Sequence, residues 1–337
     1  MLKKKILLIP AIISIIFVTG CSGISDNEPV SKTDFYFDTV INITLYGSQN
    51  AKYIDKCFEK CKSYEDLLSR TVSSSEISMI NKNVNNYTDV SDDTLEIIKS
   101  GLHYSQLSAG KFDITVGALS SLWDFTSDAH TVPAQADIEK AISTIDYNSV
   151  IVDNNKVMLS KEGAVLDLGG IAKGFIADKL KQYLISQGVK SGIIDLGGNI
   201  LLIGSRPDGS DYNIGIKKPF NDSGENSAVI RVHNKSIVTS GNYERYFYKD
   251  SKLYHHILDT STGYPVENNL YSVSIISDKS IDGDGYSTIC FLLGIDKGME
   301  FIEGTEGIEA LFIDSDYNIY YSSGLEKDNN VFQIKNS

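Results

Sequence analysis

Two groups of residues in this chain have the types and the spacing that phosphate chemistry needs. The first is Asp284 with Thr288, four positions apart at the start of a predicted helix, so that a carboxylate and a hydroxyl share one helix face. Hard oxygens of this kind suit Mg²⁺, which takes few protein ligands and leaves room for water and substrate phosphate. The ordinary alternative is a solvated Asp beside a buried Thr, because both residues are common at helix starts.

The second group lies between Val165 and Leu184. An apolar run that predicts the end of a buried strand breaks at Gly169-Gly170, and apolar residues then recur at helical spacing. A strand, a glycine break and a helix start leave backbone groups unshielded, and helix N-termini favour anions. Asp167 and Lys173 add one charge of each sign. Neither the Walker loop nor the dinucleotide glycine fingerprint is present, and a tight turn without a ligand is the alternative.

Two further stretches carry polar side chains of possible chemical use. His255 and His256 are adjacent in a predicted strand and therefore point to opposite faces, which disfavours a zinc site built from the pair. One of them is either an ordinary histidine or a base near a phosphate. The turn 240–245 has both charges and an aromatic ring, which suits either a ring-shaped ligand or a simple connection between strands.

Hydrophobic periodicity and turn residues predict the elements that must position these groups. Helices are expected at 51–68, 76–81, 91–108, 136–145, 171–184, 281–293 and 297–303. Strands are expected at 39–46, 150–152, 157–159, 192–203 with a break at Gly197-Gly198, 212–216, 228–232, 237–239, 252–258 and 271–276, with a closing hairpin at 310–321. Helices predominate early and strands later, without strict alternation, which predicts an α+β fold.

The N-terminal region has the pattern of an export signal. Three lysines precede an apolar stretch that is too short for a usual transmembrane helix, and Val18-Thr19-Gly20-Cys21 resembles the lipobox of bacterial lipoproteins. The prediction is a signal peptide at 1–20, a lipid attached to the sulfur of Cys21, a flexible tether at 21–33 and one domain at 34–337. The alternative is an ordinary secretory signal that is cut elsewhere. A lipid anchor on Cys21 would hold the domain at the cell membrane, on its extracytoplasmic face.

Charge and cysteine usage narrow the classes of partner. The 337 residues carry a formal net charge of −13, and removal of 1–20, which contains three lysines and no acid, gives −16. This argues against nucleic acid and against adhesion to anionic lipid heads, and it means that an anionic substrate must meet a local cation. Cys57 and Cys61 share a predicted helix and are expected to face the core rather than form a disulfide or a metal site.

Seven motifs, in order, together resemble the ApbE family, the bacterial FAD:protein FMN transferases. They are Ser75-Glu76-Ile77-Ser78 with Asn81, Gly110-Lys111-Phe112-Asp113-Ile114-Thr115-Val116 with Leu122-Trp123, Asp167-Leu168-Gly169-Gly170-Ile171-Ala172-Lys173-Gly174, Asp195-Leu196-Gly197-Gly198-Asn199, Ser240-Gly241-Asn242-Tyr243-Glu244-Arg245, His256-Ile257-Leu258-Asp259 with Thr262-Gly263, and Asp284 through Thr288. The sequence departs from the family at Thr71, where an aromatic residue is frequent, at Thr260, where proline is usual, and at Gly283 and Gly285, where alanines are common.

The resemblance implies an ApbE-like, T-fold-like architecture of helices and largely antiparallel sheets around a central flavin cleft. It implies Mg²⁺ held by the Gly170 carbonyl, Asp284 and Thr288. It also implies contacts to FAD, the substrate, from Phe37, Lys111, Phe112, Asp113, Asp167, Lys173 and Leu258.

The implied reaction is transfer of the FMN moiety of FAD to a Ser or Thr hydroxyl of a partner protein, with AMP as leaving group. His256 is the candidate acceptor of the hydroxyl proton. Expected acceptors are subunits of membrane redox complexes or extracellular flavoproteins. Two rivals remain at this point: a Mg²⁺-dependent FAD pyrophosphatase that gives FMN and AMP, and a non-enzymatic flavin-binding lipoprotein.

Overall fold

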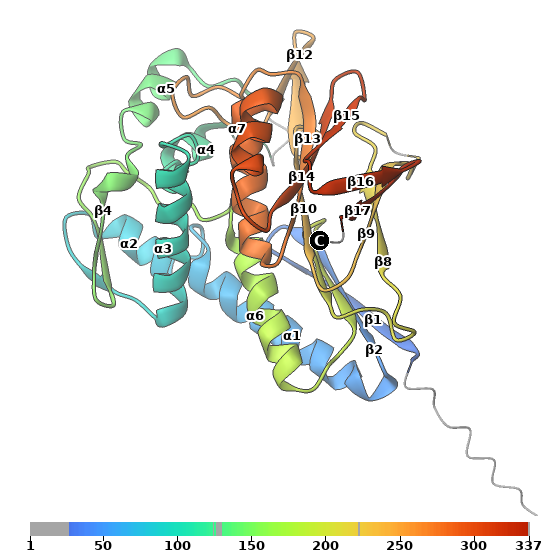
Figure 1. The fold of residues 1–337 in the computed structure, drawn as a ribbon. Coiled ribbons are helices and arrows are strands. Elements are labelled where there is room, and N and C mark those ends of the chain that lie inside the picture. Colours follow the sequence, from blue (N-terminus) through green and yellow to red (C-terminus); the bar gives the residue numbers. More distant parts are fainter. Residues whose placement is uncertain (1–26, 124, 126–129, 222, 336–337) are drawn as a thin grey trace, which may run out of the picture.

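An antiparallel sheet of eight strands is the framework of the protein (Figure 1). The computed structural model describes residues 27–123, 125, 130–221 and 223–335. Neighbouring strands of this sheet, in spatial order, are β1 (Pro29–Tyr36), β2 (Thr39–Tyr46), β6 (Gly192–Leu196), β7 (Ile200–Ile203), β10 (Ser236–Gly241), β13 (Leu270–Ser277), β14 (Glu309–Asp314) and β15 (Ile319–Tyr321).

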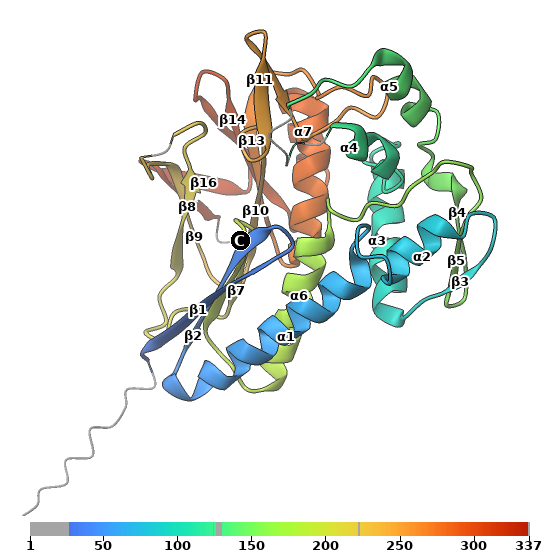
Figure 2. The same cartoon turned by 180° about the vertical axis from the view of Figure 1, so that it is seen from behind.

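The sheet is covered on both faces, and most residues of β7, β10, β13 and β14 are buried. Three helices, α1 (Ala51–Leu68), α6 (Ala172–Ser186) and α7 (Ser280–Glu303), lie on one face (Figures 1 and 2). A smaller sheet of β16 (Leu325–Asp328), β17 (Val331–Ile334), β9 (Asn226–Val232) and β8 (Tyr212–Lys217) covers the other. Successive residues of β13 divide between the two cores, with Ile275 toward the helices and Ile276 toward the smaller sheet.

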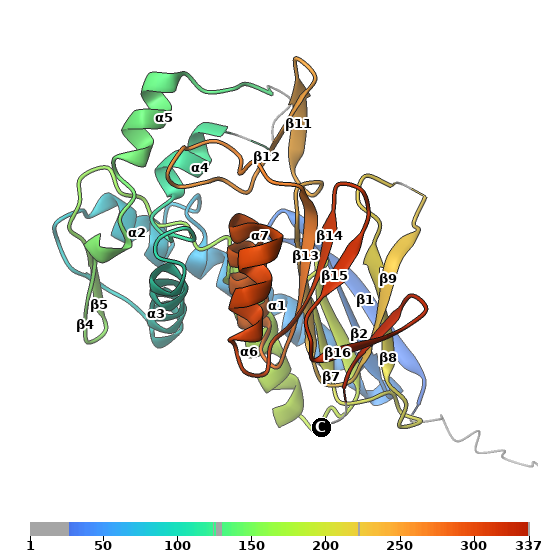
Figure 3. The ribbon, with the colours of Figure 1, turned by 45° about the horizontal axis from the view of Figure 1, so that its top comes forward.

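The remaining elements form a lobe beside the helical face (Figure 3). It contains α2 (Glu76–Lys82), α3 (Asp92–Leu107), α4 (Gly117–Trp123) and α5 (Gln135–Ile142), with a small sheet of β3 (Thr88–Asp89), β5 (Lys156–Leu159) and β4 (Val150–Asp153). The hairpin of β11 (Tyr246–Lys249) and β12 (Lys252–His255) extends beyond the end of the main sheet (Figure 3), and its Phe247 shares a buried cluster with Leu119 and Trp123 of α4. Short 3-10 turns at Ser48–Asn50 and Tyr147–Ser149 complete the described elements.

The α+β prediction is confirmed, as are most of the predicted elements. Strand 39–46 and helix 51–68 have the predicted bounds, and Ser91 caps α3 by accepting the Thr94 N–H. The two helices expected at 281–293 and 297–303 meet at Gly294, whose φ of 78° interrupts α7. Cys57 and Cys61 are buried in the core and are free thiols.

Three predictions about local structure are wrong. The tether does not extend to residue 33, because β1 begins at Pro29 and pairs along its length with β2. The run before Gly169 is an extended loop with a single bridge from Val165 to Val116 rather than a strand end. The strand predicted at 252–258 ends at His255. Within the described residues, no helix combines the length and the apolarity that crossing a membrane requires.

Candidate active site

The site is built where the first turns of α6 and α7 touch. A Cβ on Gly174 would lie 2.3 Å from the carbonyl oxygen of Ser280, so only glycine allows the two helices to approach this closely. The Gly174 backbone N–H donates to Oδ2 of Asp284 at 2.5 Å. The carboxylate thus satisfies an N–H in the first turn of α6 that has no partner within that helix.

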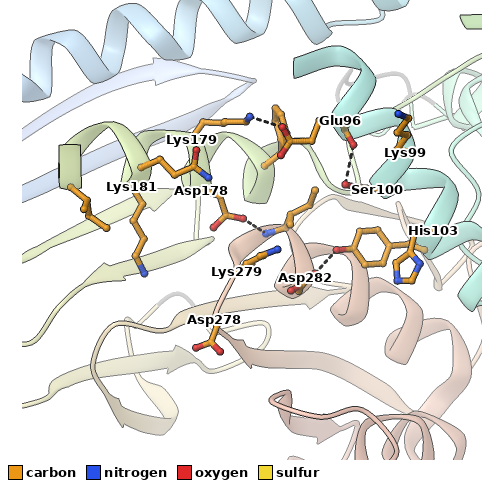
Figure 4. A pocket seen from close by; sticks show the side chains of 15 residues that line it. Glu96, Lys99, Ser100, His103, Asp178, Lys179, Lys181, Asp278, Lys279 and Asp282 are labelled. Atoms are coloured by element: carbon orange, nitrogen blue, oxygen red, sulfur yellow. Dashed lines mark hydrogen bonds and ion pairs between the residues drawn. The ribbon is translucent and has the colours of Figure 1, made fainter. Parts of the chain in front are cut away.

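The same arrangement occurs in the opposite direction. Asp178 on α6 accepts the backbone N–H groups of Ser280 and Ile281 at the start of α7, at 2.8 and 3.0 Å (Figure 4). Each helix therefore caps the other with a carboxylate four positions after the contact. Burial raises the pKa of Asp178 to about 6, although these two hydrogen bonds favour its charged form.

A groove of ≈ 520 Å³ between α3, α6 and the start of α7 lies behind this corner (Figure 4). Its four carboxylates all have partners: Glu96 pairs with Lys179, Asp278 with Lys235, Asp282 accepts from the Tyr104 hydroxyl, and Asp178 caps α7. The carboxylates of the groove are therefore satisfied, whereas Asp284 lies outside its lining.

Asp284 is a strongly perturbed carboxylate outside this groove. It is 6 % exposed, and burial raises its pKa to about 6, while Lys173, the Gly174 N–H and the Asn199 amide act in the opposite direction. Burial raises the pKa of Asp195 and lowers that of His256; Lys173 opposes the first shift and adds to the second, so that one cation acts on all three groups. This is the local positive charge that the acidic composition requires.

Thr288 follows Asp284 by one turn of α7 and is half-buried. Its hydroxyl lies 3.3 Å from Oγ of Ser240 on β10, which is itself 2.8 Å from Oγ of Ser287. The turn 240–245 thus contributes through Ser240, a residue that the sequence did not single out. The sequence did contain a signal for Ser240, because this residue is the first of one of the seven motifs.

The glycine turn before α6 is shaped by its neighbours. The Leu168 carbonyl accepts the N–H groups of Ile171 and Ala172, and the ring of Phe112 lies 2.8 Å from the position of a Cβ on Gly170. Residues 170 and 174 are separated by four positions, so their Cα atoms lie within about 14 Å of each other. The Gly170 carbonyl therefore lies in the chain segment that leads directly to the Gly174 N–H accepted by Asp284.

Asp167 stabilises this turn and is joined to a cation that sequence reasoning missed. Its Oδ1 accepts the Gly169 N–H at 2.9 Å, and its Oδ2 accepts from Ser120 at 2.8 Å and pairs with Nε of Arg70 at 3.1 Å. Arg70 also donates to Ser121 from Nη1 at 2.6 Å. No periodicity marks Arg70, which lies in the loop after α1 and meets Asp167 only in the folded chain.

The segment Lys111–Asp113 divides into an exposed and a buried part. Lys111 is exposed and lowers the pKa of Asp259, whereas Phe112 is buried against the glycine turn. Asp113 is 5 % exposed, and its carboxylate accepts from the N–H and hydroxyl of Thr115 and from the Tyr147 N–H. All its described contacts are internal, so it shapes the loop, and a direct contact with a cofactor stays a prediction.

The two histidines occupy different environments, as their alternation predicts. His255 is buried against Phe291, and Nε2 lies 3.2 Å from the Val266 carbonyl oxygen. His256 is half-buried, its Nδ1 is shielded without a hydrogen-bond partner among the described residues, and burial lowers its pKa to about 3. His256 is therefore neutral at neutral pH and free to accept a proton.

Two predicted contact residues lie farther from this corner. Phe37 is at the tip of the β1–β2 hairpin with a φ of 55°, and its N–H donates to Glu65 at 2.9 Å. Leu258 is buried with Leu119 and Trp123 and bridges to Pro265. An open cavity of ≈ 560 Å³ beside the hairpin tip is lined by Asp38, Phe125, Glu244, Arg245 and Tyr246.

The donor set around Asp284 fits Mg²⁺ better than a transition metal. The described residues contain no cluster of three or more His, Cys, Asp or Glu side chains that could hold a metal ion. A single buried carboxylate with a hydroxyl and a carbonyl suits an ion that completes its shell with water and substrate phosphate.

Comparisons with known proteins identify the family of the chain. Residues 37–312 match the model of the ApbE family. A protein named FAD:protein FMN transferase from Klebsiella pneumoniae (strain 342) is 36% identical over 302 residues, which cover 89% of this chain and 93% of the relative. One of the same name from Treponema pallidum (strain Nichols) is 30% identical, with 91% of each chain covered. The apbe protein of Thermotoga maritima msb8 has a TM-score of 0.82 at 30% identity and covers 88% of this chain and 97% of that chain. The chain therefore belongs to the ApbE family, as its seven motifs predicted.

Proposed function

We propose that this protein transfers the FMN moiety of FAD to a Ser or Thr hydroxyl of another protein. The observation that carries the proposal is the 36% identity over 89% of the chain to a FAD:protein FMN transferase. In the reaction the hydroxyl oxygen forms a bond to the phosphorus on the FMN side, the bond from that phosphorus to AMP breaks, and the hydroxyl proton passes to a base.

The residues of the chain have distinct roles in this proposal. Asp284, Thr288 and the Gly170 carbonyl would hold Mg²⁺, which when bound supplies Lewis-acid stabilisation of charge on the phosphate oxygens. Lys173 adds a cation beside Asp284, and the Gly169-Gly170 turn presents backbone groups to the diphosphate. His256, half-buried and neutral at neutral pH, would accept the proton. Phe112 closes one side of the turn.

The expected location follows from the N-terminal motif. Residues 1–26, with the predicted signal peptide and Cys21, lie outside the described residues. We propose that Cys21 is lipidated and that the domain is anchored to the membrane on its extracytoplasmic side. β1 runs from Pro29 to Tyr36, and its Pro29 end lies at the end of the sheet away from the β11–β12 hairpin (Figures 1 and 2). An anchor before Pro29 would therefore leave the cavity beside Tyr246 facing away from the membrane, open to acceptor proteins.

One incubation separates the transferase from its two rivals. The protein is mixed with FAD, Mg²⁺ and a candidate acceptor, such as a subunit of a membrane redox complex or an extracellular flavoprotein. Flavin on the acceptor is read by fluorescence on a denaturing gel and by intact mass, and AMP is quantified. Transfer predicts one AMP per FMN attached. AMP with free FMN would indicate a pyrophosphatase, and tight FAD binding without AMP would indicate a flavin-binding protein.

A further inference from the structure

Asn199 is a buried polar residue that the proposed reaction does not yet use. It ends the turn between β6 and β7, after Gly197 and Gly198, both of which have positive φ. The turn is held by Asp195, whose Oδ1 accepts the Gly198 N–H at 2.8 Å, and by the Leu196 N–H on the Asn199 carbonyl. The side chain of Asn199 is 1 % exposed and points into the protein, toward the first turn of α7.

The orientation of the Asn199 amide is set by a chain of hydroxyls. Ser280 Oγ donates to Asn199 Oδ1 at 2.5 Å and accepts in turn from Ser236 Oγ at 3.0 Å. With Oδ1 occupied in this way, Nδ2 is the atom that faces Asp284, whose carboxylate the amide stabilises in its charged form. The flipped amide would turn an oxygen toward that carboxylate, so the hydrogen-bond network selects the orientation described.

Asn199 Nδ2 lies close enough to Asp284 to favour the charged carboxylate, but it forms no hydrogen bond of good geometry within the described part of the chain, although its exposed area is below 1 Å². A buried donor without an acceptor lowers the stability of the folded state, so its presence at this position needs a functional explanation. Because the atom is shielded, a bound ligand does not reach it directly. The acceptor must come from the protein, and the Asp284 carboxylate is the neighbouring group with free lone pairs.

We infer that Asn199 is a positioning residue for Asp284. Its Nδ2–H closes onto the carboxylate and, together with the Gly174 N–H on Oδ2, fixes the rotation of the side chain, so that the remaining lone pairs stay directed at a divalent cation. Ser280 and Asp284 are the first and fifth residues of α7, so Asn199 holds the whole first turn of that helix against the β6–β7 turn. The inference rests on the metal site of the proposed function.

Titration of the full-length protein with Mn²⁺, followed by electron paramagnetic resonance in the presence of FAD, tests this role without measuring turnover. N199A removes the donor, and we expect the Kd for Mn²⁺ to rise at least tenfold. S280A releases Oδ1 and lets the amide rotate, with an expected rise of at least threefold. S274A is the matched control, because it removes another fully buried serine hydroxyl, one that pairs with Thr239 and lies outside the hydroxyl chain of Asn199. We expect its Kd to stay within a factor of 1.5.

A wild-type Kd in N199A, or equal effects of S280A and S274A, would overturn the inference. If circular dichroism shows that N199A does not fold, the comparison of S280A with S274A decides alone. A wild-type protein that binds Mn²⁺ but transfers no FMN would refute the proposed function and leave the role of Asn199 standing. A wild-type protein without measurable Mn²⁺ binding would refute the metal site and the inference together.

Discussion

Gly174 and Asp284 are 110 positions apart in the sequence and are joined by a 2.5 Å hydrogen bond from the backbone N–H to Oδ2. The bond gives one carboxylate two tasks, because the group that caps α6 is also the predicted metal ligand on α7. Asp178 performs the reciprocal cap, which leaves Asp284 as the carboxylate on the catalytic side. The geometry of the site therefore depends on the close contact between the two helices.

Replacement of Gly174 by alanine tests that dependence. The new Cβ would lie 2.3 Å from a backbone oxygen, which has no flexible end that could move aside. We expect G174A to lose about 3 kcal/mol of stability or more, as overpacked sites do, and to lose FMN transfer with it. G304A is the control, because its Cβ meets neighbours at 3.6 Å and the residue only ends α7. Denaturant unfolding that gives equal stabilities for the two variants would contradict the argument.

Replacement of Asp284 by asparagine separates the ligand from the cap. Asparagine keeps an oxygen for the Gly174 N–H but removes the charge that attracts a cation. One electrostatic contact to developing charge contributes about 3 kcal/mol, so the rate of FMN transfer should fall at least about a hundredfold at saturating FAD. Quantified AMP release gives this rate. Near-normal AMP release by D284N would remove Asp284 from the metal site.

The same variant predicts a pH-dependent change in stability. Burial raises the pKa of Asp284 from 3.8 to about 6, so the folded state holds a proton there that the unfolded chain has already lost. The stability that this proton contributes is complete below about pH 4 and is lost as pH rises through 6. In metal-free buffer we therefore expect D284N to match the wild type near pH 4 and to be more stable by roughly 1–3 kcal/mol at pH 8. Urea unfolding at pH 4 and at pH 8 gives the difference in the free energy of unfolding between D284N and the wild type. If D284N were less stable than the wild type at pH 8, the charged carboxylate would be favourable even without metal.

His256 leads to a prediction about the pH profile. Burial lowers its pKa to about 3, so the imidazole stays neutral between pH 5 and 8 and its titration gives no acidic limb in that range. If His256 accepts the hydroxyl proton, H256A should lose about 10²-fold or more in kcat with little change in the KM for FAD. H103A is the control, since His103 is exposed in the groove behind the site. Normal turnover in H256A would assign the proton to another acceptor.

Local patterns in the sequence predicted most of the fold. The helix 51–68 and the interruption of the last helix at Gly294 followed from apolar spacing and glycine placement, which depend on neighbours in the chain. β1 was missed because its residues are mostly exposed and polar and become a strand only by pairing with β2. β11, β16 and β17 are strands of four residues each, too short for a clear alternation.

The site residues that lie within a sequence motif could be predicted, whereas contacts between segments that are distant in the sequence could not. Spacing alone placed Asp284 and Thr288 on one helix face, and the structure keeps them one turn apart. The pairs Arg70–Asp167 and Asp178–Ser280 depend on how loops and helices cross, which no local pattern encodes. Asn199 was visible in its motif, but its orphaned Nδ2 is defined only by the packed hydroxyls around it.

The position of the divalent ion tests the central claim most directly. Crystals of the protein grown with FAD and Mn²⁺ would locate the ion by its anomalous scattering. We expect one peak within about 2.5 Å of an Asp284 carboxylate oxygen, the Thr288 hydroxyl and the Gly170 carbonyl, with the FAD diphosphate completing the shell. A peak that touches the diphosphate but none of these three groups would show that the proposed metal site is wrong.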